Sequence, residues 1–210
     1  MRTKLDIRKK IASEWFRYLH SQICKEFEGI ERKKSKGRRN IFLKKTTWKK
    51  SNNPKEGGGN YAILKNGAIF DSVGINFSEV SGKFQKKFRS QILGAKKNPN
   101  YWASGISVVA HMKNPKIPAM HFNTRFICTK KYGFGGGMDM TPCILDNKEK
   151  KYFHHVLKTT CDLHSKKYYP KYKKWCDNYF YLPHRQEPRG IGGIFFDYEQ
   201  NNWIKDFKFV

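Results

Sequence analysis

The chain has 210 residues and a formal net charge of +26 at pH 7, with 38% hydrophobic and 15% aromatic residues. This length suits one domain spanning residues 1–210, and the aromatic content excludes an intrinsically disordered chain. No apolar run approaches the ~20 residues of a membrane-spanning helix, and the basic N-terminus lacks the apolar segment of a secretory signal, so we expect no membrane span.

The positive charge has two interpretations. A basic surplus of this size is typical of proteins that bind nucleic acid or anionic lipid. However, only ten of the 43 basic residues are arginines, and lysine is better suited to solvation than to two-pronged recognition. We therefore favour a solvated surface and expect no nucleic-acid partner.

The cysteines indicate the redox environment. They are odd in number, scattered and without a CxxC pair: Cys24, Cys128, Cys143, Cys161 and Cys176. This pattern is typical of reduced thiols rather than of a disulfide framework, and it predicts a cytoplasmic protein.

The N-terminal third is predicted to contain a helix and then strands. Apolar residues recur at spacings of three and four over residues 12–27, which indicates an amphipathic helix. A first strand is predicted at 41–43, and Gly57–Gly59 are predicted to form a flexible turn. Asn66-Gly67 is a strong hairpin signal, with strands expected at 62–65 and 68–70.

Strands and helices follow in the rest of the chain. Two strands are predicted at 105–111 and 121–129, and the glycine cluster at 135–137 is predicted to be a loop. A helix is expected to begin near Asp146, because Asp146 and Glu149 have the spacing of a capping box. A second helix at 171–182 precedes a turn and a strand at 190–196. Strands joined by hairpins, with helices before and after, predict an α+β fold with a mainly antiparallel sheet.

The strand at 121–129 carries the most informative polar residues. Because side chains on a strand alternate, His121, Asn123 and Arg125 share one face, while Thr124 lies on the other. Three polar groups in a row predict either a solvent-exposed face or a polar pocket, since burying them unpaired costs several kcal/mol. His, Asn and Arg together can donate hydrogen bonds to an anion, and this favours the pocket.

The preceding strand adds Ser107 and His111, four residues apart and again on one face. If the two strands pair, their donors converge on one surface. Arg125 then holds a carboxylate through a two-pronged hydrogen bond, and His121 moves a proton near neutral pH. The alternative is that both histidines are ordinary residues at strand ends.

Two further groups remain open from the residues alone. Asp139 follows the glycine cluster and either pairs with N–H groups of a ligand or stabilises its own turn. Imidazole is a common metal ligand, yet no HxH or HExxH motif places two ligands on one element in the widely spaced set His111, His121, His154 and His184.

Several stretches resemble the oxygen-dependent coproporphyrinogen III oxidases, and they occur in the order of that family. They are GAIFDSVGINFS at 67–78, GISVVAH at 105–111, PAMHFNTRF at 118–126, the glycine-rich 135–142, YPKYKKWCD at 169–177, YFYLPHR at 179–185 and EPRGIGGIFFD at 187–197.

The resemblance implies oxidative decarboxylation of coproporphyrinogen III to protoporphyrinogen IX in haem biosynthesis. The co-substrate is molecular oxygen, and no flavin or haem is needed. It also implies a homodimer with a flat antiparallel sheet covered on both faces by α-helices. Ser107, Asn123, Thr124, Arg125 and Asp139 look like substrate contacts, and His121 looks like the proton donor. His111, His121, His154 and His184 match histidines proposed to hold a divalent metal ion.

The C-terminus departs from the family pattern. The chain ends at Val210, soon after the Phe196-Asp197 block, where the family continues into further strands. From this we expect an incomplete domain that is nearly inactive by itself, with an uncovered apolar end. The alternative function is a split-gene or decayed product that binds porphyrinogen without turnover.

Overall fold

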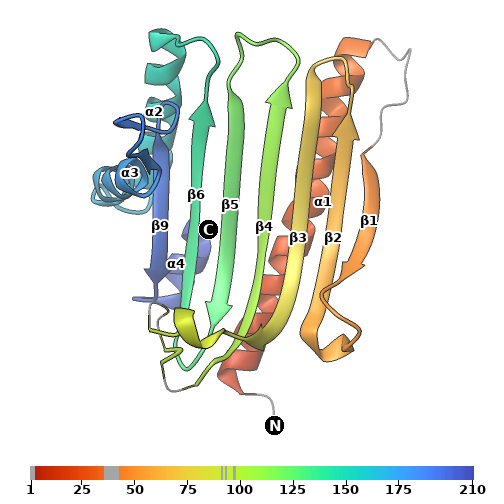
Figure 1. The fold of residues 1–210 in the computed structure, drawn as a ribbon, viewed down its shortest axis with the longest axis vertical. Coiled ribbons are helices and arrows are strands. Elements are labelled where there is room, and N and C mark those ends of the chain that lie inside the picture. The colour runs from red at the N-terminus through yellow and green to blue at the C-terminus, as the bar shows by residue number, and fades with distance from the viewer. Residues whose placement is uncertain (1–2, 36–42, 91, 93, 97) are drawn as a thin grey trace.

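The computed structural model describes residues 3–35, 43–90, 92, 94–96 and 98–210. Its centre is a seven-stranded antiparallel sheet in the order β1-β2-β3-β4-β5-β6-β9 (Figure 1). The strands are β1 (Lys44–Lys49), β2 (Gly57–Lys65), β3 (Phe70–Lys83), β4 (Asn100–Met112), β5 (Ala119–Cys128), β6 (Tyr132–Thr141) and β9 (Gly193–Glu199). A small ribbon pairs β7 (Tyr181–Leu182) with β8 (Glu187–Pro188). The predicted α+β class with a mainly antiparallel sheet is confirmed.

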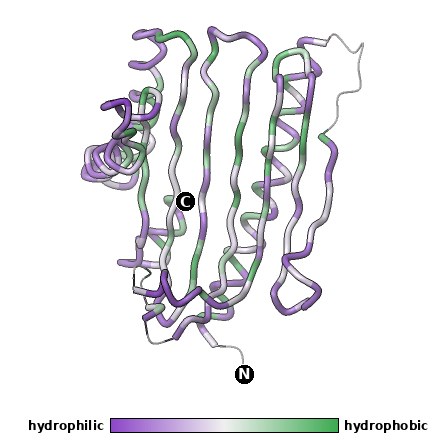
Figure 2. Tube along the Cα trace, viewed as in Figure 1, coloured by the Kyte–Doolittle hydropathy of each residue, from purple (hydrophilic) through white to green (hydrophobic). Residues whose placement is uncertain are grey.

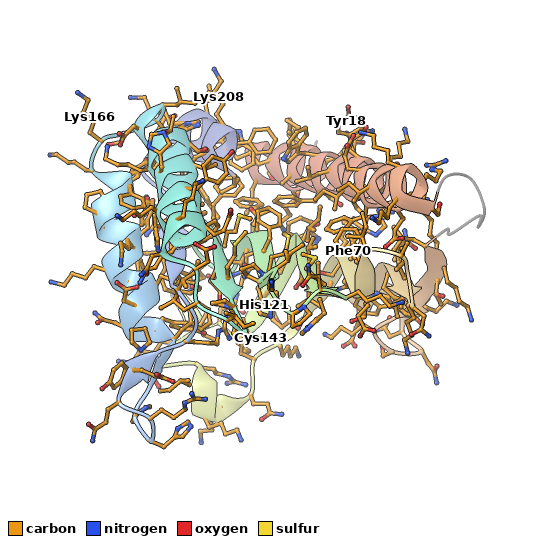
Figure 3. All side chains as sticks on the ribbon, turned by 90° about the horizontal axis from the view of Figure 1, so that it is seen from above. Tyr18, Phe70, His121, Cys143, Lys166 and Lys208 are labelled. Carbon is orange, nitrogen blue, oxygen red and sulfur yellow. The ribbon has the colours of Figure 1, made fainter. Side chains whose placement is uncertain are left out.

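The helices cover the two faces of the sheet unequally. They are α1 (Lys4–Ser35), α2 (Asn147–Asp162), α3 (Tyr168–Tyr179) and α4 (Trp203–Phe209), with single 3-10 turns at Pro54–Glu56 and Lys86–Phe88. Figure 3 shows α1, α2 and α4 on one side of the sheet and α3 beside its edge. In the described residues, helical cover of the second face is therefore limited to the β9 edge, whereas we expected helices over both faces. This leaves the centre of one face open, and we call it the open face.

The hydrophobic core lies between the sheet and α1. Hydrophobic and hydrophilic residues alternate along the central strands (Figure 2), so one face can be buried while the other stays polar. Phe77, Phe126 and Phe134 point toward the helices and are at most 1% exposed, and Phe16 of α1 is fully buried against them. Burying each phenylalanine contributes about 1.5–3 kcal/mol.

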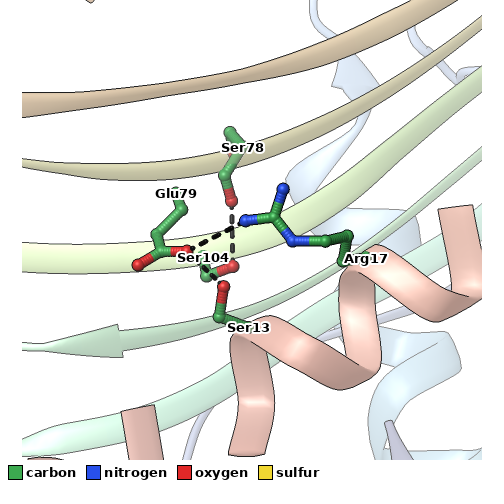
Figure 4. A network of polar contacts seen from close by, with 5 residues as sticks. All are labelled: Ser13, Arg17, Ser78, Glu79 and Ser104. Atoms are coloured by element: carbon green, nitrogen blue, oxygen red, sulfur yellow. Dashed lines mark hydrogen bonds and ion pairs between the residues drawn. The ribbon is translucent and has the colours of Figure 1, made fainter. Parts of the chain in front are cut away.

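Two carboxylates, Glu31 and the partly exposed Glu79, fix α1 to the sheet. Glu31 is fully buried and accepts hydrogen bonds of 2.7–2.9 Å from the backbone N–H groups of Ala68, Ile69 and Phe70. At the other end of the helix, Ser13 and Arg17 both donate to the Glu79 carboxylate on β3 (Figure 4). The three hydrogen bonds to Glu31 satisfy a charge that would otherwise be costly to bury.

The structure confirms most predicted elements and corrects two turns. The first helix, the strands at 105–111 and 121–129, the helix capped by Asp146 and the last strand are all present. Gly57–Gly59 lie within β2, and Gly135–Gly137 lie within β6, because pairing with neighbouring strands satisfies their backbones. Only Leu43 of the strand predicted at 41–43 is described, and β1 begins at the next residue.

The C-terminal helix is packed against the sheet. Trp203 of α4 lies 5.0 Å from Phe126 and 5.1 Å from Phe134, measured between ring centroids. Phe209 contacts Tyr172 of α3 and Phe196 of β9. The aromatic residues that we expected to be uncovered are thus packed against other rings and half-buried, whereas Ile204 is 62% exposed. No helix among the described residues is both long and apolar enough to cross a membrane.

Candidate active site

Strand register collects the polar side chains of the open face into three rows. In the first row, cross-strand pairing aligns Asn76, Ser107, Asn123 and Gly137. The second row aligns Ser78, Gly105, Arg125 and Gly135, and the third aligns Gly74, Val109, His121 and Asp139. Directly opposed residues of antiparallel strands point to the same face. Pairing of β4 and β5 therefore brings Ser107, His121, Asn123 and Arg125 to one face, as strand alternation predicted, and β6 adds Asp139 to them.

A shallow cavity of about 290 Å³ lies over the first two rows. Its border includes Asn76, Ser78, Ser107, Asn123 and Arg125. This volume is at the lower end of the range for small-molecule sites. It suits one polar arm of a ligand, while a larger ligand body would extend over the open face.

Arg125 already has one carboxylate partner. Its Nη2 donates to Asp197 Oδ2 on β9 at 2.6 Å, across the backbone of β6. Burial raises the pKa of Asp197, and the Arg125 guanidinium opposes that rise. A charged pair of this kind in a half-buried place is a strong hydrogen bond.

Asp139 is held by Arg189, which follows the β7–β8 ribbon. Arg189 donates to Asp139 Oδ2 from Nε at 3.2 Å and from Nη2 at 2.8 Å. The Arg189 guanidinium also stacks on the Phe180 ring at 3.8 Å from its centroid. Both hydrogen bonds end on Oδ2, so the geometry leaves Oδ1 of this buried carboxylate available for another donor.

His121 lies beside Asp139, with 34% of its side chain exposed. Its Nδ1 is 3.8 Å from Asp139 Oδ2, which is too long for a hydrogen bond, and this buried nitrogen has no hydrogen-bond partner. Burial lowers the pKa of His121; Asp139 raises it, while Arg189 and His111 lower it further. The imidazole is therefore mainly neutral near pH 7.

The four histidines expected to hold a metal ion do not come together. The rings of His111 and His121 are 6.4 Å apart, but His154 is on α2 and His184 is in the turn of the β7–β8 ribbon. His154 already uses both ring nitrogens, Nε2 with the Ile191 carbonyl and Nδ1 with the Tyr169 hydroxyl. Across the described residues, no three His, Cys, Asp or Glu side chains are placed to bind one ion. The residues present do not fit a four-histidine metal centre.

Thr124 was expected to contact substrate, and its position argues against that role. Its side chain is 2% exposed and points to the helix-covered face, between its neighbours Phe122 and Phe126. The alternation of the strand separates it from Asn123 and Arg125. Only the backbone at this position can face the cavity.

Four residues of the site were not predicted from the sequence: Trp48, Asn76, Arg189 and Asp197. Asn76 accepts a hydrogen bond of 3.0 Å from the indole N–H of Trp48 on β1. Apolar and polar residues alternate along β3, and Asn76 lies between Ile75 and Phe77. This pattern could have predicted that the Asn76 side chain points to the polar face. Asp197 and Arg189 contact residues 72 and 50 positions away in the chain, so no local pattern points to them.

Comparisons with known proteins show which family this chain resembles. A family model described as Coproporphyrinogen III oxidase matches residues 11–210. Proteins named oxygen-dependent coproporphyrinogen-III oxidase from Rickettsia africae and Rickettsia rickettsii are each 48% identical over 205 residues. One of the same name from Rickettsia bellii is 47% identical over 205 residues. Each alignment covers 96% of this chain and 72% of the relative.

Proposed function

The chain belongs to the coproporphyrinogen III oxidase family, and on that premise we propose that it decarboxylates coproporphyrinogen III oxidatively to protoporphyrinogen IX. The observation that carries this proposal is the open face, where Arg125, Asn123 and Ser107 converge beside His121 and Asp139. The substrate bears four carboxylates and four pyrrole N–H groups, and this face offers both anion-binding donors and a carboxylate acceptor.

The carboxylate of a reacting propionate binds at Arg125. The contact with Asp197 uses one N–H of Nη2, and this guanidinium makes no other hydrogen bond among the described residues. The second N–H of Nη2 and an adjacent N–H of Nε or Nη1 therefore remain as a fork for the substrate carboxylate. The amide of Asn123 and the hydroxyl of Ser107 lie in the adjacent row and add neutral donors. Charged, two-pronged binding of this kind positions the reacting group, which is a large part of catalysis.

The reaction is an oxidation with molecular oxygen as the electron acceptor. For each propionate, a C–H bond at the carbon attached to the pyrrole and the bond to the carboxylate both break, and the vinyl double bond forms. Carbon dioxide leaves with one proton and two electrons released. Oxygen takes both electrons and two protons, one of them from solvent, and becomes hydrogen peroxide.

His121 acts as the base that accepts the proton from the reacting carbon. Burial keeps its imidazole neutral, so it can take up the proton released when the C–H bond breaks. Asp139 Oδ2 lies 3.8 Å from His121 Nδ1 and stabilises the imidazolium that forms. Asp139 Oδ1 accepts from the pyrrole N–H groups, while Arg189 fixes its carboxylate.

No step of this mechanism passes through a metal ion, because the four histidines are not gathered into a ligand set. We also propose a homodimer, as the resemblance implies. Light scattering tests this directly, since a dimer has twice the 24.8 kDa of the chain.

The decisive assay is conversion of coproporphyrinogen III by this chain alone in air. Reaction products are oxidised and measured by their porphyrin fluorescence, with an oxygen-free reaction as control. Oxygen-dependent loss of the propionates is the result that supports the proposed function. Tight substrate binding without conversion would instead favour the alternative of a non-catalytic porphyrinogen-binding protein.

A further inference from the structure

Asp197 is the carboxylate in contact with the guanidinium that we assign to substrate binding. It lies on β9, with its Oδ2 2.6 Å from Arg125 Nη2. The other carboxylate oxygen accepts from the backbone N–H of Tyr198 at 2.9 Å. Asp197 is the more enclosed partner, with 13% of its side chain exposed against 37% for Arg125. The Asp197 carboxylate is therefore held in place by the protein, and the Arg125 guanidinium is the member of the pair that faces the cavity.

Gly135 makes this contact possible. It lies on β6 between the two strands that carry the pair. A Cβ on Gly135 would lie 2.6 Å from Asp197 Oδ1 and 3.3 Å from both Cζ and Nη2 of Arg125. The guanidinium thus lies flat on bare backbone, because no side chain at this position lifts it away from the sheet.

We propose that Asp197 is a positioning residue for the carboxylate-binding arginine. It holds Arg125 across Gly135 through one N–H of Nη2, and it leaves the second N–H of Nη2 and its neighbouring N–H groups presented to a substrate carboxylate. This rests on the proposed function, and it adds a residue that the substrate does not touch. An arginine loses less freedom on binding when its plane is already fixed, so the anchor improves affinity for the ligand.

The energetics of Asp197 are consistent with a functional role. Burial raises its pKa, which means that keeping it ionised opposes folding rather than supporting it. If Asp197 served stability alone, an uncharged residue of the same shape, such as asparagine, would make the folded protein more stable. Asp197→Asn should therefore unfold at the same temperature as the wild type or higher, and yet bind substrate less well.

The test is a double-mutant cycle on steady-state kinetics with coproporphyrinogen III. We expect Asp197→Ala to raise KM about tenfold, and Asp197→Asn to raise it about threefold because the amide oxygen retains one acceptor. In an Arg125→Ala background, Asp197→Ala should change KM less than about twofold, since the residue to be positioned is gone. Asp162→Asn on α2, which loses an ion pair with Lys158 far from the open face, is the matched control. An equal effect of Asp197→Ala in both backgrounds, or a lower KM, would overturn the proposal.

A second measurement needs no turnover. Phenylglyoxal modifies arginines, and peptide mass spectrometry reads the rate at Arg125 alone. Freed from its anchor, Arg125 should react at least about threefold faster in Asp197→Ala than in the wild type, because a neighbouring carboxylate stabilises the unreactive charged form. Equal rates would reject the anchoring contact. A wild-type chain that neither converts nor binds the substrate would reject the proposed function instead, whatever the rates at Arg125.

Discussion

Arg189 grips the carboxylate of Asp139 with two hydrogen bonds to the same oxygen, at 2.8 and 3.2 Å, while its guanidinium lies on the ring of Phe180. The contact joins the segment after the β7–β8 ribbon to the C-terminal end of β6. It fixes a buried acid of the open face beside His121. The catalytic geometry that we propose therefore depends on a residue 50 positions away in the chain.

Removing the hydrogen bonds between Arg189 and Asp139 should lower both the stability and the activity of the protein. We expect Arg189→Ala to lower the free energy of unfolding by about 1–3 kcal/mol, because Asp139 would stay buried without a partner. Urea unfolding measures the loss. The matched control is Arg185→Ala, whose ion pair with Glu187 is largely exposed and is worth only about 0–1 kcal/mol. Equal losses for both variants would contradict the role of Arg189.

Arg125→Ala should weaken substrate binding by about 2–5 kcal/mol, as expected when a desolvated carboxylate loses its charged partner. Arg125→Lys should recover only part of this, since an ammonium group cannot reproduce the fork. The measurement is the KM for coproporphyrinogen III. Unchanged affinity in Arg125→Ala would remove this residue from the site.

His121→Ala should lower turnover while leaving substrate affinity largely intact, because a proton-transfer group acts mainly in the transition state. Dialysis against a chelator should leave the wild-type rate unchanged, since His154 already uses both ring nitrogens in hydrogen bonds. A rate that disappears on chelation and returns with a divalent ion would show that the histidines rearrange around a metal.

The free energy of unfolding should fall as the pH drops below about 6.5, because three buried or partly buried histidines resist protonation in the folded protein. Burial lowers the pKa of His20, His121 and His154 below the ordinary value of 6.5. The unfolded chain then binds more protons than the folded one, so stability is full above 6.5 and is lost as the pH falls toward the folded pKa. Urea unfolding between pH 7.5 and 5 measures this slope. His154→Gln should reduce it, whereas the same change at the exposed neighbour His155 should not.

Two adjacent glycines of β6 should respond differently to alanine. Gly135→Ala places its Cβ 2.6 Å from a side-chain oxygen of Asp197, and the pair can move aside, so KM should rise while the melting temperature changes little. Gly136→Ala places its Cβ 2.7 Å from the Asn123 carbonyl and against the ring of Phe196, where neither neighbour yields easily. We expect a clear loss of melting temperature for this variant. The reverse pattern would show that the site tolerates a methyl group over Gly135.

Local patterns in the sequence were sufficient for the framework of the fold. The periodicity of α1, the cap at Asp146 and the hairpin signal at Asn66-Gly67 all depend on neighbouring residues, and they predicted elements that the structure contains. The same alternation placed His121, Asn123 and Arg125 on one face. It also separated Thr124 from them, although the family resemblance suggested a substrate contact there.

Only the tertiary structure decided which partners these residues have. The glycine runs became strands because strand neighbours supply their backbone hydrogen bonds, and this outweighs their preference for turns. Asp197 and Arg189 reach Arg125 and Asp139 because β9 returns beside β6 after two intervening helices. The sequence by itself therefore determined the polar face, since side-chain direction is a local property of a strand. The ion pairs that orient that face were decided by strand order, which depends on packing between distant segments.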